Sequence, residues 1–180
     1  MADIETISSR VVYHNKWMSV REDKIRRASG AEGIYGVVDK PDFAVILPID
    51  GDRIHLVQQY RYTFKKRCWE LPQGAWEAQP DIEPEQLALA ELREETGLVA
   101  GRMIHVAEQH LAYGFCTQSY HIFIALDCQQ GDKHLDIEEE DLVSKWFTIA
   151  EFEAMILNGE IKDATTVNAY GLTKLKGLLK

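Results

Sequence analysis

The sequence lacks the features that place a chain in a membrane or hold it together with disulfides. No stretch approaches the roughly 18 apolar residues of a membrane-spanning helix, and the N-terminal MADIETISSR is acidic where a signal peptide is positively charged. The cysteines, Cys68, Cys116 and Cys128, form no CxxC pair, and their odd number does not indicate a disulfide framework. We therefore expect a cytoplasmic protein that does not bind a membrane.

Positive charge is also scarce. The chain has 20 Lys and Arg against 29 Asp and Glu, a formal net charge of −9. A field of this sign repels a polyanion, so the composition argues against nucleic-acid binding. The six histidines show no zinc-ligand spacing, and a glycine-rich phosphate loop of the Walker type is missing. A phosphate-bearing substrate would therefore need local basic residues or a metal ion.

What is present is the composition of an ordinary globular protein, with 46% hydrophobic and 27% charged residues in 180. Short alternating runs over residues 10–40 predict two or three antiparallel strands, which we interpret as a small N-terminal β subdomain at 1–42. A buried strand at 43–49, a turn at 50–52 and a strand from 53 to about 60 begin the main domain, residues 43–180.

The main domain alternates strands and helices. After a polar loop, Pro84 is well placed to begin a helix that runs to about Thr96, with Gly97 as its left-handed cap. Ala88, Leu89 and Leu92 would form the core face of this helix. These elements predict an α/β fold, a mixed sheet with helices on its faces. Further strands are expected at 103–108, 120–127 and 142–148, and further helices at 149–157 and 165–179.

The helix from Pro84 to Thr96 crowds acidic residues onto one turn. Glu91, Glu94 and Glu95 lie within five positions, although like charges three or four residues apart destabilise a helix by roughly 0.2–0.5 kcal/mol per pair. Either this face is solvated, or a cation lies against it. Mg²⁺ is typically held by one or two carboxylates, waters and substrate phosphates. A second acidic run, at 138–141, is either a solvated turn or part of the same site.

Residues 74–98, GAWEAQPDIEPEQLALAELREETGL, resemble the Nudix box. The second half of the box pattern fits, but the slot of its arginine holds Ala90 and the slot of its first glutamate holds Ile82. Gly74 lies two residues too far from the helix. The box arginine pairs with a box carboxylate, so its absence leaves Glu94 or Glu95 to be oriented by other donors or by metal. The residues that match the pattern are Glu91, Leu92, Glu94, Glu95, Gly97 and Leu98.

Outside the box, LVQQYRY followed by WELPQG, and EEEDLVSKWFTIAEFEAMILNGEI, are similar to the Nudix branch that cleaves ADP-ribose and related nucleoside diphosphate sugars. The resemblance implies a Nudix-like α/β/α sandwich whose N-terminal strands form a dimerising subdomain, so we expect a homodimer. It also implies a Mg²⁺-dependent hydrolase, with Mn²⁺ as a substitute, that converts ADP-ribose to AMP and ribose 5-phosphate.

The resemblance also implies roles for individual residues. The implied metal ligands are Glu91 and Glu95, with Glu94 as a third carboxylate that also serves catalysis, Glu140, and the carbonyl of Gln73. Glu138 is the implied general base. Substrate would contact the phosphate-binding Arg61, Glu70 as a hydrogen-bond acceptor, and Gly74. The basic run Lys65, Lys66 and Arg67 either adds to the phosphate contacts or is an ordinary hairpin tip.

Two alternatives stay open at the level of sequence. The substrate could be another nucleoside diphosphate sugar, a dinucleotide or a nucleoside triphosphate. The altered first half of the box, with Ala90 in place of arginine, is also compatible with a sensor that binds a nucleotide without hydrolysing it. Product formation separates the enzyme from the sensor.

Overall fold

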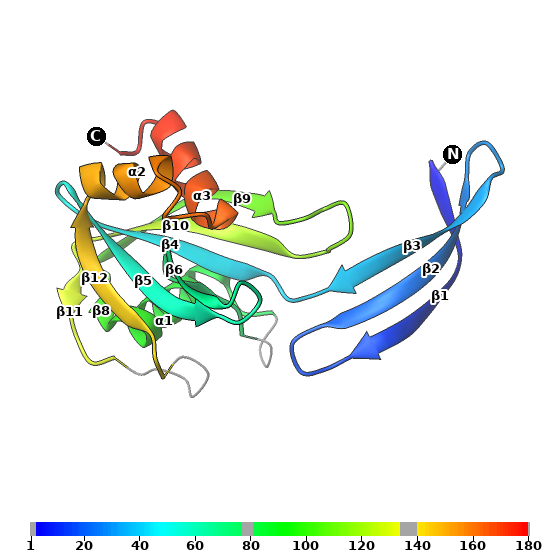
Figure 1. Cartoon of the computed structure of the whole chain (residues 1–180), viewed down its shortest axis with the longest axis horizontal. Helices are drawn as coiled ribbons and strands as arrows, with labels where there is room; N and C mark the ends of the chain where they lie inside the picture. Colours follow the sequence, from blue (N-terminus) through cyan, green and yellow to red (C-terminus); the bar gives the residue numbers. More distant parts are fainter. Residues whose placement is uncertain (1–2, 77–80, 134–139, 180) are drawn as a thin grey trace.

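An N-terminal antiparallel sheet projects from the body of the molecule in the computed structural model, which describes residues 3–76, 81–133 and 140–179 (Figure 1). Its strands are β1 (Ile4–His14), β2 (Ser19–Arg27) and β3 (Glu32–Asp39), in the order β1-β2-β3. Strand β1 is exposed along its whole length. The predicted small N-terminal β unit is therefore confirmed as a three-stranded sheet.

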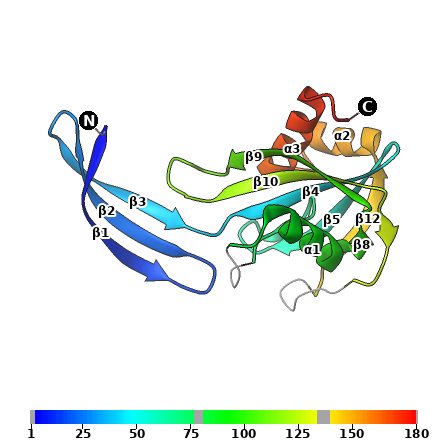
Figure 2. The same ribbon diagram turned by 180° about the vertical axis from the view of Figure 1, so that it is seen from behind.

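Strand β3 connects this sheet to the body through backbone hydrogen bonds. The Val38 amide donates to the Phe115 carbonyl at 2.8 Å, and the Thr117 amide donates to the Val38 carbonyl at 3.0 Å. The Tyr35 hydroxyl adds a bond of 2.7 Å to the Gly114 carbonyl. The connection between β9 (Arg102–His110) and β10 (Ser119–Leu126) thus supports the base of the N-terminal sheet, as both ribbon views show (Figures 1 and 2).

The main sheet of the body is mixed. Its order is β12-β5-β4-β10-β9, in which β10 runs parallel to β4 and the other neighbours are antiparallel. Two short strands extend it, since β6 pairs with β5 and β7 pairs with β4. The bounds are β4 (Phe43–Asp50), β5 (Arg53–Arg61), β6 (Lys66–Glu70), β7 (Gln73–Gly74), β9 (Arg102–His110), β10 (Ser119–Leu126) and β12 (Val143–Thr148); β8 (Leu98–Val99) pairs with β11 (Gln129–Gln130).

Helices cover both faces of this sheet, which makes the expected α/β/α sandwich. Helix α1 (Pro84–Thr96) packs with Ala44 and Ile46 of β4 on one face. Helices α2 (Ile149–Leu157) and α3 (Ala164–Leu175) pack on the other, against Val45 and Leu47 (Figure 2). Within the described residues, no helix is long and apolar enough to cross a membrane.

Helix α1 begins and ends where its sequence predicts. Pro84 occupies the first turn, and Gly97 closes the helix at φ 75°, a left-handed conformation that glycine adopts without steric cost. One predicted core residue is wrong, because Leu89 is 37% exposed and Leu87, 5% exposed, packs in the core instead. The buried stripe runs through Leu87, Glu91 and Glu95 at intervals of four, and Leu89 lies off it.

Candidate active site

The acidic turn of α1 lies over the short strand β7. Glu91 is 6% exposed and Glu95 is fully buried, whereas Glu94 is half-buried. Carboxylates one helical turn apart are costly to bury without compensating donors or cations. A solvated helix face therefore does not explain Glu91 and Glu95, although it was one of the two alternatives at the sequence level.

Glu95 is held by a backbone donor from β7. The amide of Gln73 donates to Glu95 Oε2 at 3.0 Å. Pairing of Gln73 with Val45 of β4 fixes this amide in the sheet. A donor that belongs to the backbone thus orients one of the carboxylates that the missing box arginine would otherwise orient.

Gly74 leaves the space that Glu91 occupies. A Cβ atom built on Gly74 would lie 2.5 Å from Glu91 Cδ and 2.8 Å from Glu91 Oε1. No side chain larger than hydrogen fits there unless the carboxylate moves. The structure thus brings together four of the expected site residues on α1 and β7, namely Gln73, Gly74, Glu91 and Glu95.

An ion pair between the half-exposed Arg61 and the buried Glu70 lies at the end of β5, beside these carboxylates. Arg61 Nη2 contacts Glu70 Oε1 at 2.7 Å, and the Gln73 side-chain amide donates to Glu70 Oε2 at 3.0 Å. Burial raises the pKa of Glu70, and the charge of Arg61 opposes that rise. Burial lowers the pKa of Arg61, but Glu70, Glu95 and Asp163 outweigh it, so the net pKa is raised and the guanidinium stays charged.

Asp163 is a site neighbour that sequence reasoning did not find. It caps α3, where its Oδ2 accepts a hydrogen bond from the Thr166 amide at 2.8 Å, and the Gln73 side chain approaches the same oxygen at 3.4 Å. The available signal, an aspartate just before a helix, indicates a cap and says nothing about a neighbour 90 residues earlier.

The second acidic run is only partly described. Glu138, the expected general base, lies outside the described residues, and Glu140 is exposed. The next residue, Asp141, is held by Arg67, whose Nη1 contacts Asp141 Oδ2 at 2.5 Å and whose Nη2 donates to the Asp141 carbonyl at 2.7 Å. Arg67, for which a phosphate contact or a plain hairpin tip was expected, thus contacts the acidic run.

The carboxylate oxygens of α1 are suitable ligands for a hard divalent cation. Among the described residues, no group of three or more His, Cys, Asp or Glu side chains is arranged to hold a metal. A Mg²⁺ ion nevertheless needs only one or two protein carboxylates when waters and substrate phosphates complete its shell. Glu91 and Glu95 supply two, and the Cβ-free space at Gly74 keeps the backbone close to them. The residues present therefore fit such an ion.

Comparison with known families identifies the chain. Residues 39–169 match the model of the NUDIX domain, and residues 4–38 match that of the nucleoside diphosphate sugar hydrolase N-terminal domain. The chain therefore belongs to the Nudix family, as a pyrophosphatase-type hydrolase with the added N-terminal unit. Hydrolases of this family generally use divalent metals.

Individual relatives agree with this assignment. The chain is 32% identical to ADP-ribose pyrophosphatase of Mycobacterium tuberculosis, over 92% of this chain and 80% of that protein. It is 25% identical to ADP-ribose pyrophosphatase of Bacillus subtilis, over 98% and 95%. A crystal structure of an ADP compounds hydrolase matches with a TM-score of 0.86 at 19% identity, covering 99% of this chain and 97% of that one, which confirms the predicted fold.

Proposed function

We propose that the protein hydrolyses the pyrophosphate bond of ADP-ribose, with water as co-substrate, to give AMP and ribose 5-phosphate. The observation that carries this proposal is the buried carboxylate pair Glu91 and Glu95. Glu91 packs against Gly74, and Glu95 lies within the electrostatic reach of Arg61. The names of the relatives from M. tuberculosis and B. subtilis support ADP-ribose as the substrate.

The chemistry of a pyrophosphate explains this arrangement of charge. Its anionic oxygens repel a nucleophile, so the site has to present positive charge to the phosphates and remove a proton from water. We assign Glu91, Glu95 and Glu94 as ligands of Mg²⁺, which Mn²⁺ replaces, with the Gln73 carbonyl and Glu140 as further contacts. When bound, the ion neutralises the phosphate oxygens.

We assign the remaining roles to other residues that the Nudix resemblance implies. Arg61 presents its guanidinium to a phosphate, for which the planar fork of arginine is suited. Its bond to Glu70 holds the guanidinium in place. We assign Glu70 as a hydrogen-bond acceptor for a sugar or nucleotide hydroxyl. Gly74 lets substrate approach the backbone. Glu138 accepts the proton of the attacking water, and Glu94 assists catalysis.

The proposal extends to assembly and location. We propose that residues 1–42 form a dimerising unit and residues 43–180 the hydrolase domain, within a cytoplasmic homodimer. Large apolar side chains on the projecting sheet, among them Val11, Tyr13 and Ile34, are exposed in the single chain and suit burial against a second copy. Sedimentation of the intact chain and of a Val11→Glu variant tests this, since a dimer through this sheet dissociates in the variant.

The test of the function is product formation from ADP-ribose, other nucleoside diphosphate sugars, dinucleotides and nucleoside triphosphates, with Mg²⁺ and with EDTA. The key variant is Glu95→Gln, and Glu85→Gln, an exposed residue of the same helix, is the matched control. We expect metal-dependent turnover that falls at least 100-fold in Glu95→Gln and persists in the control. Nucleotide binding without product would instead identify the sensor that Ala90 suggests.

A further inference from the structure

The side chain of Gln73 lies at the centre of a network that joins both helical layers to Arg61. Its Nε2 donates to Glu70 Oε2 at 3.0 Å and to Asp163 Oδ2 at 3.4 Å. The backbone amide of the same residue donates to Glu95 of α1, while Asp163 caps α3 on the other face of the sheet. One residue of β7 therefore contacts carboxylates from β6, from α1 and from the cap of α3.

A second bond from α3 holds the segment between Glu70 and Gln73. The Leu71 amide donates to Thr166 Oγ1 at 2.9 Å, and both of these residues are fully buried. The Thr166 amide in turn donates to Asp163 Oδ2 at 2.8 Å. The first turn of α3 thus fixes Asp163 beside Gln73 through the same threonine that binds the neighbouring backbone.

Two carboxylates share the side-chain nitrogen of this neutral residue. One oxygen of Glu70 and one of Asp163 lie within 3.4 Å of the same Gln73 nitrogen, and Glu70 is only 3% exposed, so water screens their repulsion poorly. Burial raises the pKa of Glu70, the charge of Asp163 adds to that rise, and the hydrogen bond from Gln73 lowers it. A primary amide has two N–H donors and no charge, so it binds both oxygens at once.

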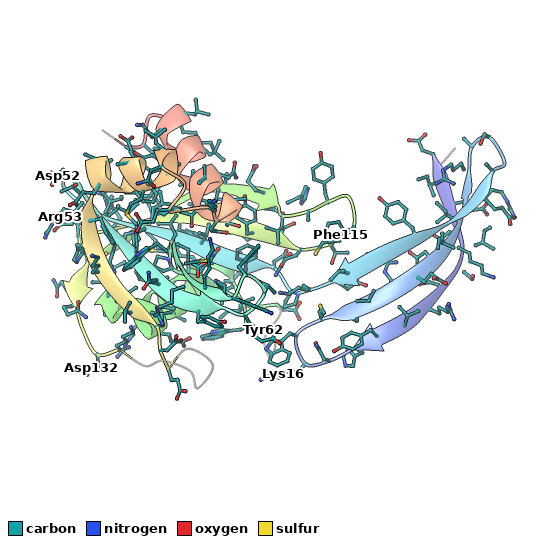
Figure 3. All side chains as sticks on the ribbon, in the orientation of Figure 1. Lys16, Asp52, Arg53, Tyr62, Phe115 and Asp132 are labelled. Carbon is teal, nitrogen blue, oxygen red and sulfur yellow. The ribbon has the colours of Figure 1, made fainter. Side chains whose placement is uncertain are left out.

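The other oxygen of Glu70 contacts Arg61, to which the proposed function assigns a phosphate of the substrate. Glu70 Oε1 lies 2.7 Å from Arg61 Nη2. Arg61 is the last residue of β5, directly before Tyr62, which is labelled at the end of this strand in Figure 3. The Arg61 side chain is 37% exposed, so its guanidinium can reach a substrate while Glu70 holds its inner side. A shift of the Glu70 carboxylate would therefore release the guanidinium.

We propose that Gln73 acts through its side chain as a positioning residue for phosphate binding. The amide keeps the Glu70 and Asp163 carboxylates apart, and it thereby holds Glu70 against Arg61. The inference rests on the proposed function, because it takes Arg61 to contact a phosphate of the substrate. This role of the side chain is separate from that of the Gln73 backbone, whose carbonyl and amide serve the proposed metal site.

The experiment measures kcat, KM for ADP-ribose and the Mg²⁺ concentration that gives half-maximal rate, in the wild type and in Gln73→Leu. Leucine has a similar volume, so the substitution removes the amide without leaving a large cavity. An arginine that binds the phosphate equally in the ground state and the transition state affects KM more than kcat. We expect KM to rise about tenfold, the effect of losing one hydrogen bond to a charged group, with a smaller change in kcat. The Mg²⁺ requirement should stay constant, because leucine keeps the backbone groups of this position.

Two further variants separate positioning from a general loss of structure. Adding Asp163→Asn to Gln73→Leu removes the repulsion while asparagine still caps α3, so KM should return about threefold toward the wild-type value. Gln109→Leu is the matched control, because Gln109 is a half-buried glutamine of β9 whose side chain donates to the Glu108 carbonyl. This control should keep the wild-type KM.

Three outcomes would overturn the inference. The first is a KM of Gln73→Leu equal to that of the wild type. The second is a KM that does not fall when Asp163→Asn is added, which would show that repulsion between carboxylates is not the cause. The third is a changed Mg²⁺ requirement in Gln73→Leu, which would assign the effect to the metal site at β7. A wild type that forms no AMP refutes the proposed function instead, and the Kd of ADP-ribose in the same proteins then tests the role of Gln73 separately.

Discussion

Replacing Gly74 with alanine should disable the hydrolase without unfolding it. The new Cβ would lie 2.5 Å from Glu91 Cδ and 2.8 Å from Glu91 Oε1, whereas carbon atoms in contact are separated by about 3.5–4.0 Å. The backbone of Gly74 is paired in β7 and lies outside the positive-φ region, so alanine itself fits the backbone there. The carboxylate of Glu91 must therefore move by about 1 Å.

The expected effects of Gly74→Ala on stability and on kcat follow from the displacement of the Glu91 carboxylate. The obstructing atoms are the far end of a flexible side chain, so the fold accommodates the change, and loss of glycine entropy in the unfolded chain contributes about 0.4–1 kcal/mol of stability. Displacement of a catalytic group by 1 Å costs about 100-fold in rate. We expect kcat for ADP-ribose to fall about 100-fold while the melting temperature does not fall.

The assay is metal-dependent release of AMP, paired with thermal unfolding of the same samples. Gly171→Ala in α3 is the control, because within the described structure no atom other than its chain neighbours and the backbone of its own helix turn lies within 4 Å of its Cβ position. That variant should gain about 0.5–1 kcal/mol of helix stability and keep wild-type kcat. If Gly74→Ala retains kcat within twofold of the wild type, the position of the Glu91 carboxylate does not limit the reaction and the proposed metal site is wrong.

Two further predictions concern stability. Burial, with a smaller contribution from Lys133, lowers the pKa of His55 to about 4. Between pH 6.5 and 4, His55 is therefore protonated in the unfolded chain and neutral in the folded chain. The free energy of unfolding contributed by His55 is complete above pH 6.5 and falls by about 3 kcal/mol toward pH 4. Urea unfolding measured across this pH range should show a weaker fall in the free energy of unfolding of His55→Phe than of the wild type. An equal pH dependence in the two proteins would contradict the assignment. Arg61→Met leaves the Glu70 carboxylate buried without its cation and should cost about 3 kcal/mol, part of which Glu70→Gln restores in the double variant. Equal unfolding free energies of the single and double variants would show that the buried charge is not the cause.

The fold followed from the sequence where local signals act within a few residues. Pro84 and Gly97 set the ends of α1 because one lacks an amide hydrogen and the other adopts positive φ, and both act on the backbone directly. Helix α2 was predicted with its observed bounds of Ile149–Leu157. The prediction of the buried face of α1 was wrong at Leu89, because the sequence of the helix does not say which of its side chains lie over β7.

The site was predictable to the same extent. Glu91 and Glu95 are four residues apart, so their shared face follows from helix geometry alone. The contact of Arg67 with Asp141 joins positions 74 residues apart and depends on the pairing of β5 with β6 and β12, which no local pattern encodes. The same holds for the bond between Arg61 and Glu70, which forms across two paired strands.

The substitution of the box arginine by Ala90 is compatible with an intact site because the sheet supplies what the side chain would have supplied. The Gln73 amide donates to Glu95 Oε2 at 3.0 Å, and the charge of Arg61 acts on the same glutamate. A backbone donor fixed by strand pairing loses no side-chain entropy, whereas an arginine would lose about 2 kcal/mol on being fixed. Loss of the arginine therefore leaves the Glu95 carboxylate oriented. The carboxylate of Glu91 is more sensitive to substitution, because its position depends on the absence of a side chain at Gly74.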